Sequence, residues 1–512
     1  MLFKIVTGGD SVEGSAFSKK EVVHQTGSIQ ELQEQVSYYC GNTHDLVTLQ
    51  IKNDSIERTS LMIYIEPLID QIKLEELLEW SREMKWLTNE RMTSSKIQMY
   101  DAGLMFEQLV KQLLEGEAFL LSFENNAWEV EGIKIPKELS RAIEEPKSEQ
   151  VLRGPHSGFT ESLSNNIYQI RKRLKTPHLV VKYFQVGRES NTNSVLVYVD
   201  NIANQLVVEE FIRRIESIDV DVAHSIGFLE EMLEDDCFSP FPQFLVTERS
   251  DRVTGNLSEG RIAYMLDGSP TAIIGPANFF SFYQSPDDYN GRFIIGTFYR
   301  MLRLSSFIVA LLLPALYIAI ISFHFEVIPE SLTLPTKRAV EAIPYPPLFE
   351  ALILEVTIEL IREAAIRLPF PLGQTIGVVG GLVIGDAVVN AGFVSNVMVI
   401  VVALTAISSF VVPSVEMNST VRILRFPFML LATFFGFYGV TVGLVILMIH
   451  LIRLESLGLP YLSPLAPFHK SGFRDTIFRM PAWLQNTRPS QTLTPNKIRQ
   501  GFSKRWHYAN KK

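Results

Sequence analysis

The chain has 512 residues, of which 47% are hydrophobic, and a formal net charge of −9. That length predicts two or three domains. Residues 1–300 carry 29 basic and 45 acidic side chains, whereas residues 453–512 carry 11 basic and 2 acidic ones. Because the basic end follows a long apolar region, the asymmetry favours a membrane-proximal cytoplasmic tail over a nucleic-acid-binding segment.

The first 300 residues alternate strand-like and helix-like segments of ordinary polarity. They begin without the apolar region of a secretory signal, so we expect them to remain in the cytoplasm. The only two cysteines, Cys40 and Cys237, have no paired spacing. The sequence therefore predicts neither a disulfide framework nor a metal site, and it indicates no cofactor.

Two segments of this half resemble each other, one beginning at His44 and the other at His178. They align without gaps at an offset of 134 residues, with Tyr64 and Tyr198 among the identical pairs. Each shows strand, strand, amphipathic helix. Chance agreement between two α/β segments is the alternative to duplication. We expect two related α/β lobes, at 1–145 and 150–245.

A coupling region at 246–300 follows, with a β-hairpin predicted by the Asp-Gly pair between two apolar runs. Asp251, Glu259 and Asp267 could serve as catalytic acids in an enzyme. However, no nucleophile–base pair and no metal-ligand spacing accompanies them. We therefore expect a non-enzymatic role in joining the soluble part to the membrane part. The residues assigned to this coupling motif are Asp251, Arg252, Gly255, Asn256, Glu259, Gly260, Arg261, Asp267 and Gly268.

Residues 301–453 read as an all-α membrane domain. Four apolar segments are long enough to cross a bilayer about 30 Å thick, at 304–323, 372–394, 396–413 and 426–452. Four crossings return the basic tail, 454–512, to the side of the N-terminal lobes, which places both termini in the cytoplasm. Flanking arginines, Arg422, Arg425 and Arg453, are expected to anchor the helix ends at the interface.

Segment 348–368 differs from these spans because one side of its predicted helix is charged. Glu355, Glu359, Arg362, Glu363 and Arg367 share that side, and apolar residues occupy the other. A fifth full crossing would put the basic tail outside. We therefore favour an interfacial or re-entrant helix, with a pore-facing crossing as the alternative.

Small and polar residues mark the next span. Gly373, Gly377, Gly381 and Gly385 recur every four residues, a pattern that lets another helix backbone approach closely in lipid. Asp386 and Asn390 share a face directly after them. Since a carboxylate at membrane depth is costly, it is expected to serve a pore, a partner or a proton. These two residues and the charged side of 348–368 are our pore and gating candidates.

Several motifs together resemble those of the A subunits of spore germination nutrient receptors, the GerA family of endospore-forming bacteria. The resemblance runs from about residue 150 to 465. The motifs are RGPHSGFTE, DRVTGNLSEGR, DGSP, DDY, LPALYI, PYPP, IREAAIRLP, VVGGLVIGDAVVNAG and LPYLSP.

The resemblance implies a multi-pass protein of the spore inner membrane that is not an enzyme. Its implied partners are further copies of itself, a transporter-like B subunit, a lipoprotein C subunit and membrane lipid. Its implied function is to trigger germination as an oligomeric, ligand-gated channel for monovalent cations. Two alternatives remain open: a secondary transporter with its site near Asp386, and a non-conducting, sporulation-stage paralogue that modulates other receptors.

Overall fold

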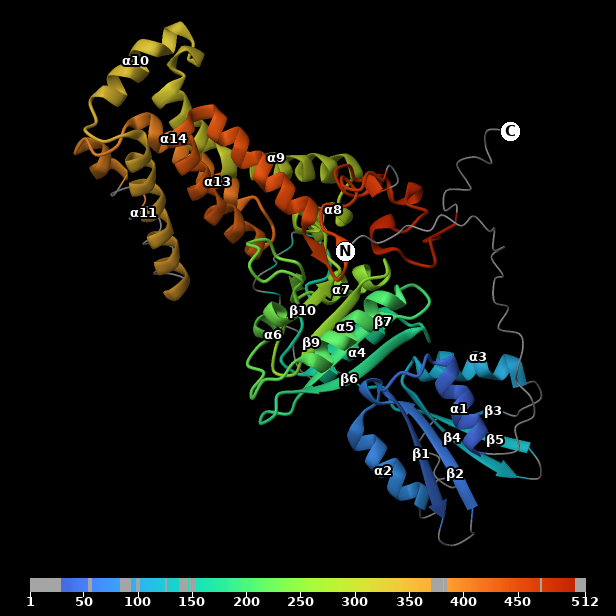
Figure 1. Cartoon of the computed structure of the whole chain (residues 1–512). Helices are drawn as coiled ribbons and strands as arrows, with labels where there is room; N and C mark the ends of the chain where they lie inside the picture. The colour runs from blue at the N-terminus through green and yellow to red at the C-terminus, as the bar shows by residue number, and fades with distance from the viewer. Residues whose placement is uncertain are drawn as a thin grey trace, which may run out of the picture. The chain divides into compact units, whose positions relative to one another are not determined.

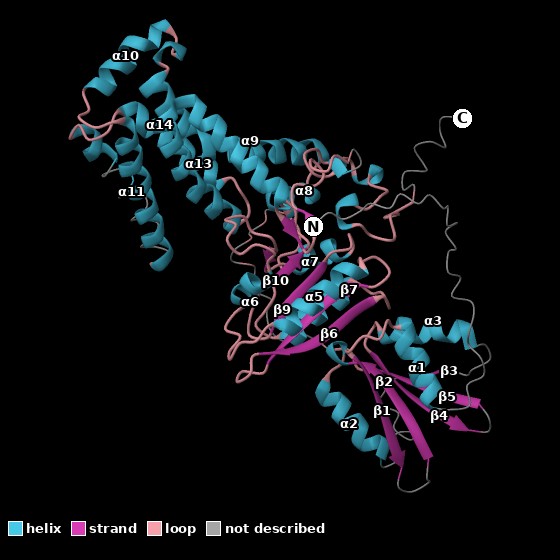
Figure 2. Ribbon diagram, in the orientation of Figure 1, coloured by secondary structure: helices cyan, strands magenta, loops and turns pink. Residues whose placement is uncertain are grey.

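The computed structural model describes residues 29–53, 58–82, 94–97, 102–124, 127–137, 146, 149, 151, 153–369, 381, 385–469 and 472–501. The chain divides into two compact units, one of Met1–Ser140 with Arg171–Val180 and the other of Arg141–Ile170 with Val181–Lys512 (Figure 1). Both contain a mixed α/β layer, and the second also carries the apolar helices (Figure 2).

The first unit is built on a five-stranded antiparallel sheet in the order β1-β2-β4-β5-β3. Strand β2 is an interior strand between β1 and β4, and its uninterrupted apolar run Leu61–Ile65 is at most 7% exposed. Its Met62 packs with Leu74 and Leu77 of α2 in the core. The elements are α1 (Ile29–Tyr39), β1 (Leu46–Asn53), β2 (Arg58–Ile65), η1 (Glu66–Leu68), α2 (Gln71–Arg82), β3 (Ser94–Ile97), α3 (Ala102–Leu113), β4 (Glu117–Glu124) and β5 (Ala127–Lys134).

The second sheet has the order β6-β7-β9-β10-β8. Its core holds Phe211 of α5 edge-on to Phe244 and to Tyr264 of β9, with ring centroids 6.0 and 5.5 Å apart. The elements are α4 (Leu163–Arg173), β6 (Leu179–Val186), β7 (Thr192–Val199), α5 (Gln205–Ser217), α6 (Ile226–Leu233), β8 (Leu245–Thr247), α7 (Ser250–Leu257), β9 (Ile262–Leu266) and β10 (Ala272–Gly275).

The predicted hairpin is present as β9 and β10, but the boundary drawn at residue 245 is wrong. Strands β8, β9 and β10 are hydrogen-bonded into the same sheet as β6 and β7. The segment expected to couple the lobe to the helices is therefore part of the lobe itself. Its apolar strands are buried because they complete the sheet.

The two sheets share one topology. In each, the first two strands pair, the third lies at the far edge, and the last two form a hairpin inside the sheet. The sequence offset of 134 residues also relates the starts of β2 and β7, and those of α2 and α5. Equal strand order together with equal spacing is what a duplicated α/β lobe would show.

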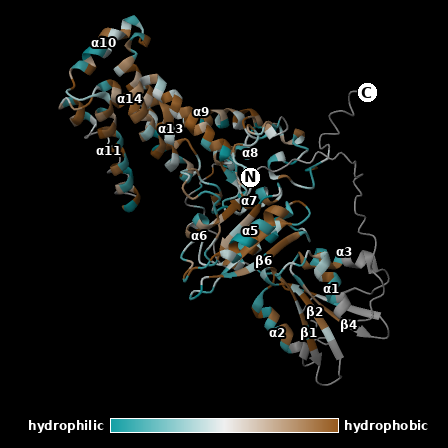
Figure 3. Cartoon of the chain, viewed as in Figure 1, coloured by the Kyte–Doolittle hydropathy of each residue, from teal (hydrophilic) through white to brown (hydrophobic). Residues whose placement is uncertain are grey.

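Four of the described helices that follow in the second unit, α9, α11, α13 and α14, are rich in apolar residues (Figure 3). By length and composition, α9 and α14 are apolar enough to cross a membrane, and α13 is a shorter apolar helix. Pro314 lies inside α9. The elements are η3 (Phe279–Tyr283), α8 (Pro286–Asn290), α9 (Phe293–Phe323), η4 (Phe325–Val327), α10 (Glu330–Glu341), α11 (Pro347–Arg367), α13 (Asn396–Phe410) and α14 (Val415–Arg453). Most of the span predicted at 372–394 lies outside the described residues.

The span predicted at 426–452 is not one straight helix. Gly436 interrupts α14 with φ +57° and ψ −137°, a conformation open to glycine. A Cβ on Gly439 would lie 2.0 Å from the carbonyl oxygen of Leu431, eight residues earlier, which requires the chain to reverse. Thr420 and His450 both contact the loop at 239–240. α14 is therefore a helical hairpin with arms at 415–435 and 437–453.

The described residues after 454 pack against the second α/β lobe and do not form a separate tail. Ser456 donates a hydrogen bond of 2.7 Å to the carbonyl of Gln243, and Thr492 donates one of 2.9 Å to that of Glu259. A basic side chain of this segment takes part as well, because Nε of Arg488 donates a 2.9 Å hydrogen bond to the carbonyl of Ser258. The elements are β11 (Glu455–Ser456), β12 (Leu459–Pro460), η5 (Gly472–Arg474), η6 (Ala482–Leu484) and η7 (Ser490–Thr492).

Candidate ion path and coupling site

A buried ion pair joins α11 to the first arm of α14. Glu355 is 0% exposed and Arg425 is 2% exposed, and Nη1 of the arginine donates to Oε2 of the glutamate. Among the described residues, Oε1 of Glu355 and Nε and Nη2 of Arg425 have no hydrogen-bond partner. A buried charge needs both a counter-charge and hydrogen bonds, so this pair is only partly satisfied within one chain.

A second charged layer lies one turn further along α11. Glu359 accepts a hydrogen bond of 2.6 Å from Arg422 and forms a 3.4 Å ion pair with Arg362. The guanidinium of Arg362 lies 4.4 Å from the ring centroid of Phe410 at the end of α13. These side chains are half-buried rather than lipid-facing.

The register of these contacts shows that α11 and the first arm of α14 are antiparallel. Advancing along α11 from Glu355 to Glu359 moves the partner back along α14 from Arg425 to Arg422. The expectation that these two arginines are interfacial anchors is therefore wrong. Their side chains turn inward because an antiparallel helix presents carboxylates at matching spacing.

The charged side of α11 is graded along its length. Glu363 and Arg367 pair with each other, with Nε donating over 2.8 Å, and their side chains are 59% and 76% exposed. Such an i, i+4 pair on an exposed surface contributes little. The five charged residues predicted to act together therefore differ in burial. Glu355 is buried, Glu359 and Arg362 are half-buried, and Glu363 and Arg367 are exposed.

One buried acid of α11 was missed from the sequence. Glu350 is fully buried, and its Oε2 accepts a 2.8 Å hydrogen bond from the backbone N–H of Ser395, the N-cap of α13. A carboxylate at a helix N-terminus is stabilised by the unpaired amides there. It falls outside the four-residue spacing of the other glutamates, so periodicity gave no indication of it.

The polar and small residues after α11 lie on an open surface of the chain. Asn390 Nδ2 donates a 3.0 Å hydrogen bond to Asp386, and both residues are exposed. Within the described ranges, no hydrogen bond or ion pair joins them to the charges of α11. A Cβ on Gly381 or Gly385 would meet nothing within 4 Å. Gly373 and Gly377 lie outside the described residues.

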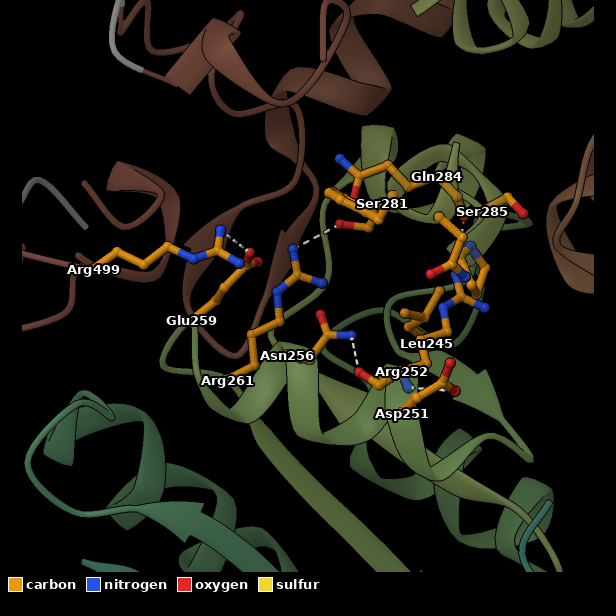
Figure 4. Close-up of a pocket in the computed structure, with 14 residues that line it drawn as sticks. Leu245, Asp251, Arg252, Asn256, Glu259, Arg261, Ser281, Gln284, Ser285 and Arg499 are labelled. Atoms are coloured by element: carbon orange, nitrogen blue, oxygen red, sulfur yellow. Dashed lines mark hydrogen bonds and ion pairs between the residues drawn. The ribbon is translucent and has the colours of Figure 1, made fainter. Parts of the chain in front are cut away.

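The predicted coupling motif surrounds a cavity of about 270 Å³ between α7, the 281–290 segment and the last described residues of the chain (Figure 4). Asp251 forms a 2.8 Å ion pair with Arg249, and Arg252 pairs with Glu149. The cavity is lined by Leu245, Asp251, Arg252, Gly255, Asn256, Glu259, Arg261, Ser281, Gln284, Ser285, Pro286, Tyr289, Asn290 and Arg499.

Glu259 and Arg261 sit on opposite sides of Gly260 with different partners. Glu259 accepts a 3.1 Å hydrogen bond from Arg499, while Arg261 Nη2 donates to Ser281 over 2.8 Å. Burial raises the pKa of Glu259 and lowers that of Arg261. Gly260 has φ +91°, and a Cβ there would lie 2.1 Å from Thr494. The close approach of the C-terminal segment therefore requires glycine.

Other residues of the motif have structural roles. Asn256 Nδ2 donates a 2.7 Å hydrogen bond to the carbonyl of Arg252, which holds the end of α7. Asp267 accepts a 3.1 Å hydrogen bond from the backbone of Leu163 at the start of α4, and Gly268 takes φ +83° in the hairpin turn. Gly255 is exposed, with open space where a Cβ would point.

A buried arginine ties α9 to its surroundings. Arg300 is 0% exposed, forms a 3.4 Å ion pair with Asp288 and a 3.1 Å ion pair with Asp475. Arg303 forms a 2.8 Å ion pair with the same Asp288. These charges fix the first turns of α9 to α8 and to the C-terminal segment. The acidic residue at 288 belongs to the DDY motif, but its arginine partners were not identified from the sequence.

The fold and these sites define a multidomain α+β protein whose apolar helices carry buried ion pairs. The first of these helices, α9, is tied by ion pairs to α8 and to the C-terminal segment. Its residues 34–491 match the family model described as Bacillus/Clostridium GerA spore germination protein. The chain belongs to the GerA family, which confirms the resemblance found in its motifs.

Curated relatives agree with this assignment. Spore germination protein KA of Bacillus subtilis is 38% identical over 91% of this chain and 87% of its own length. Spore germination protein B1 of the same species is 42% identical over 70% and 75%. GerLA of Bacillus cereus, also called a spore germination protein, is 36% identical over 91% and 96%.

One solved structure, the N-terminal domain of the A subunit of the Bacillus megaterium spore germinant receptor GerK3, is 27% identical with a TM-score of 0.36. The match covers 49% of this chain and 95% of that one.

Proposed function

We propose that this chain is the A subunit of a nutrient-sensing germinant receptor and forms the ion-conducting part of an oligomer in the spore inner membrane. In this function it triggers germination by releasing monovalent cations when nutrient is sensed. A transporter-like B subunit and a lipoprotein C subunit would be its partners. The relatives named as spore germination proteins support the germination role.

The observation that carries the conducting role is the buried pair of Glu355 and Arg425 within apolar helices. Ionisable groups at membrane depth are expensive and mark ion or substrate paths. Buried polar atoms of this pair have no hydrogen-bond partner among the described residues. Water, ions or a neighbouring subunit would satisfy them in an oligomer.

The arrangement of the helices supports a membrane domain with both ends on one side. Asn278, before α9, is hydrogen-bonded to Gln491, after α14, so these two segments share a compartment. Each arm of α14 is about 25–30 Å long, which suits a single crossing. At the other end, Gly436 lies against Phe323 and His324 at the end of α9.

The proposal is tested by potassium flux from liposomes that contain the purified full chain. We expect flux in the reconstituted protein and a changed flux in Glu355→Gln and Glu359→Gln. The matched control is Glu363→Gln, which makes the same change on the same helix at an exposed pair and should conduct as the parent does. Equal liposome incorporation must be measured by quantitative blotting for all variants.

The outcomes separate the three functions. Flux that is linear in the cation gradient supports a channel. Saturable flux coupled to a second gradient would instead identify a secondary transporter. No flux from a correctly assembled oligomer, also with the B and C subunits present, would contradict conduction and favour a modulating paralogue.

A further inference from the structure

The cavity bordered by the coupling motif contains an arginine that makes no ion-pair contact with a described carboxylate. Three arginines line it, and two are paired, Arg252 with Glu149 and Arg499 with Glu259. In the part of the chain that the structure describes, Arg261 forms no ion pair. Among the described residues its Nε has no hydrogen-bond partner, and its Nη2 donates to the neutral hydroxyl of Ser281.

This guanidinium is almost completely removed from solvent, with 4% of the residue exposed. Buried arginines are ordinarily paired, because an isolated charge at low dielectric is costly. Figure 4 shows Arg261 between the Glu259–Arg499 pair on one side and Asp251 and Arg252 on the other. The two carboxylates that line the cavity already pair with other arginines, Glu259 with Arg499 and Asp251 with Arg249. Glu259 acts on Arg261 as a nearby charge without an ion-pair contact.

We propose that this cavity binds a small oxyanion, a carboxylate or phosphate group, through Arg261. A guanidinium presents parallel N–H donors that match the oxygen pair of either group. The volume of about 270 Å³ lies just below the range of about 300–1,000 Å³ typical of ligand pockets, so it suits a small ligand. Neutral water molecules would fill the same space without balancing the charge.

The position of the site gives the bound anion a consequence for the helices. The wall opposite α7 is formed by the segment that includes Ser285 and Tyr289, which ends directly before α9 begins at Phe293. The remaining wall includes Arg499 of the C-terminal segment. An anion held by Arg261 would therefore join three segments that meet at the base of α9. This role goes beyond the conducting function proposed above and does not depend on it.

The test is titration of the purified full chain in detergent with inorganic phosphate and, separately, with acetate, in a buffer of low chloride. We expect saturable heat by calorimetry and a raised unfolding temperature with at least one of the two. Phosphate alone or acetate alone identifies which oxyanion source the site accepts. Arg261→Met should weaken binding at least about tenfold, as expected for loss of a charge-assisted hydrogen bond, and Arg261→Lys should retain part of it.

A gain-of-function variant protects the test against a folding defect. Glu259→Gln removes a negative charge from the cavity wall and releases Arg499, so it should bind the anion several-fold more tightly. The matched control is Arg188→Gln, because Arg188 is an exposed arginine paired with Asp219 and lies outside the cavity. It should bind as the parent does.

The proposal is overturned if neither oxyanion binds saturably, or if chloride alone does. It is also overturned if Arg261→Met binds with parental affinity. Weaker binding by Glu259→Gln would contradict it as well, and this result remains decisive where Arg261→Met fails to fold.

Discussion

Removing one member of the buried pair should destabilise the helices far more than removing an exposed one. Glu355→Gln keeps the side-chain shape but leaves Arg425, which is 2% exposed, without a counter-charge. Breaking such a pair costs about 3–5 kcal/mol. Glu363→Gln makes the same chemical change on the same helix, where the glutamate is 59% exposed, and should cost at most about 0.5 kcal/mol.

The assay is equilibrium unfolding of the purified chain by titration with a denaturing detergent. Substituting both partners, with Glu355→Met and Arg425→Met together, should recover stability to within about 1 kcal/mol of the parent, because no unpaired charge remains. The recovered protein should still show altered ion flux, which separates the stability of the pair from its role in conduction. If Glu355→Gln costs no more than Glu363→Gln, or if the double variant is as unstable as Glu355→Gln, the pair is not a buried interaction.

Three further predictions follow from single side chains. Burial and the neighbouring carboxylates of Glu416 and Glu234 raise the pKa of Glu230 to about 9. Since the folded state holds that proton more tightly than the unfolded state, stability should be greatest at low pH and should fall from about pH 5 to pH 9. Glu230→Gln should remove most of this pH dependence in melting curves. Glu231→Gln, at an exposed position, should not. Gly439→Ala forces a Cβ to within 2.0 Å of a backbone carbonyl and should cost more than about 2 kcal/mol in the same detergent titration; parental stability would mean that α14 does not fold back. Among the described residues, a Cβ on Gly381 would meet nothing within 4 Å, so Gly381→Leu should leave monomer unfolding unchanged and disrupt only the oligomer on native gels; an unaltered oligomer would remove this glycine from the interface.

The elements of the soluble half could be predicted well because local pattern determines them. The alternating strands and the Asp-Gly turn specify β7, β9 and β10 whatever they pack against. The boundary at 245 could not be placed, because strand order within a sheet depends on contacts between residues distant in sequence. A three-residue strand such as β8 carries too little pattern to show which sheet it joins.

The acidic residues of the candidate site were predicted from the sequence, but their arginine partners were not. The spacing of Glu355 and Glu359 marks one face of a helix, but their partners come from a segment about 65 residues later. Arg422 and Arg425, at i and i+3 on a neighbouring helix, are what an antiparallel partner would offer. Matching the two spacings could have identified the pairing. No such pattern marks Arg261, because its importance lies in burial, which one position in a sequence does not disclose.

Counting crossings gives a parity but does not locate the crossings. The basic C-terminal segment required an even number, and a fifth crossing at 348–368 was rejected on that ground. The chain reversal at Gly436 changes the count of possible crossings, here called legs. A hairpin at α14 adds one leg to the predicted four, and a full-length α11 would add another. Two additions leave the parity unchanged, so the contact between Asn278 and Gln491 is satisfied equally by four legs or by six. The antiparallel register of α11 with the first arm of α14 favours six, because it makes α11 a packed leg whose carboxylates face arginines.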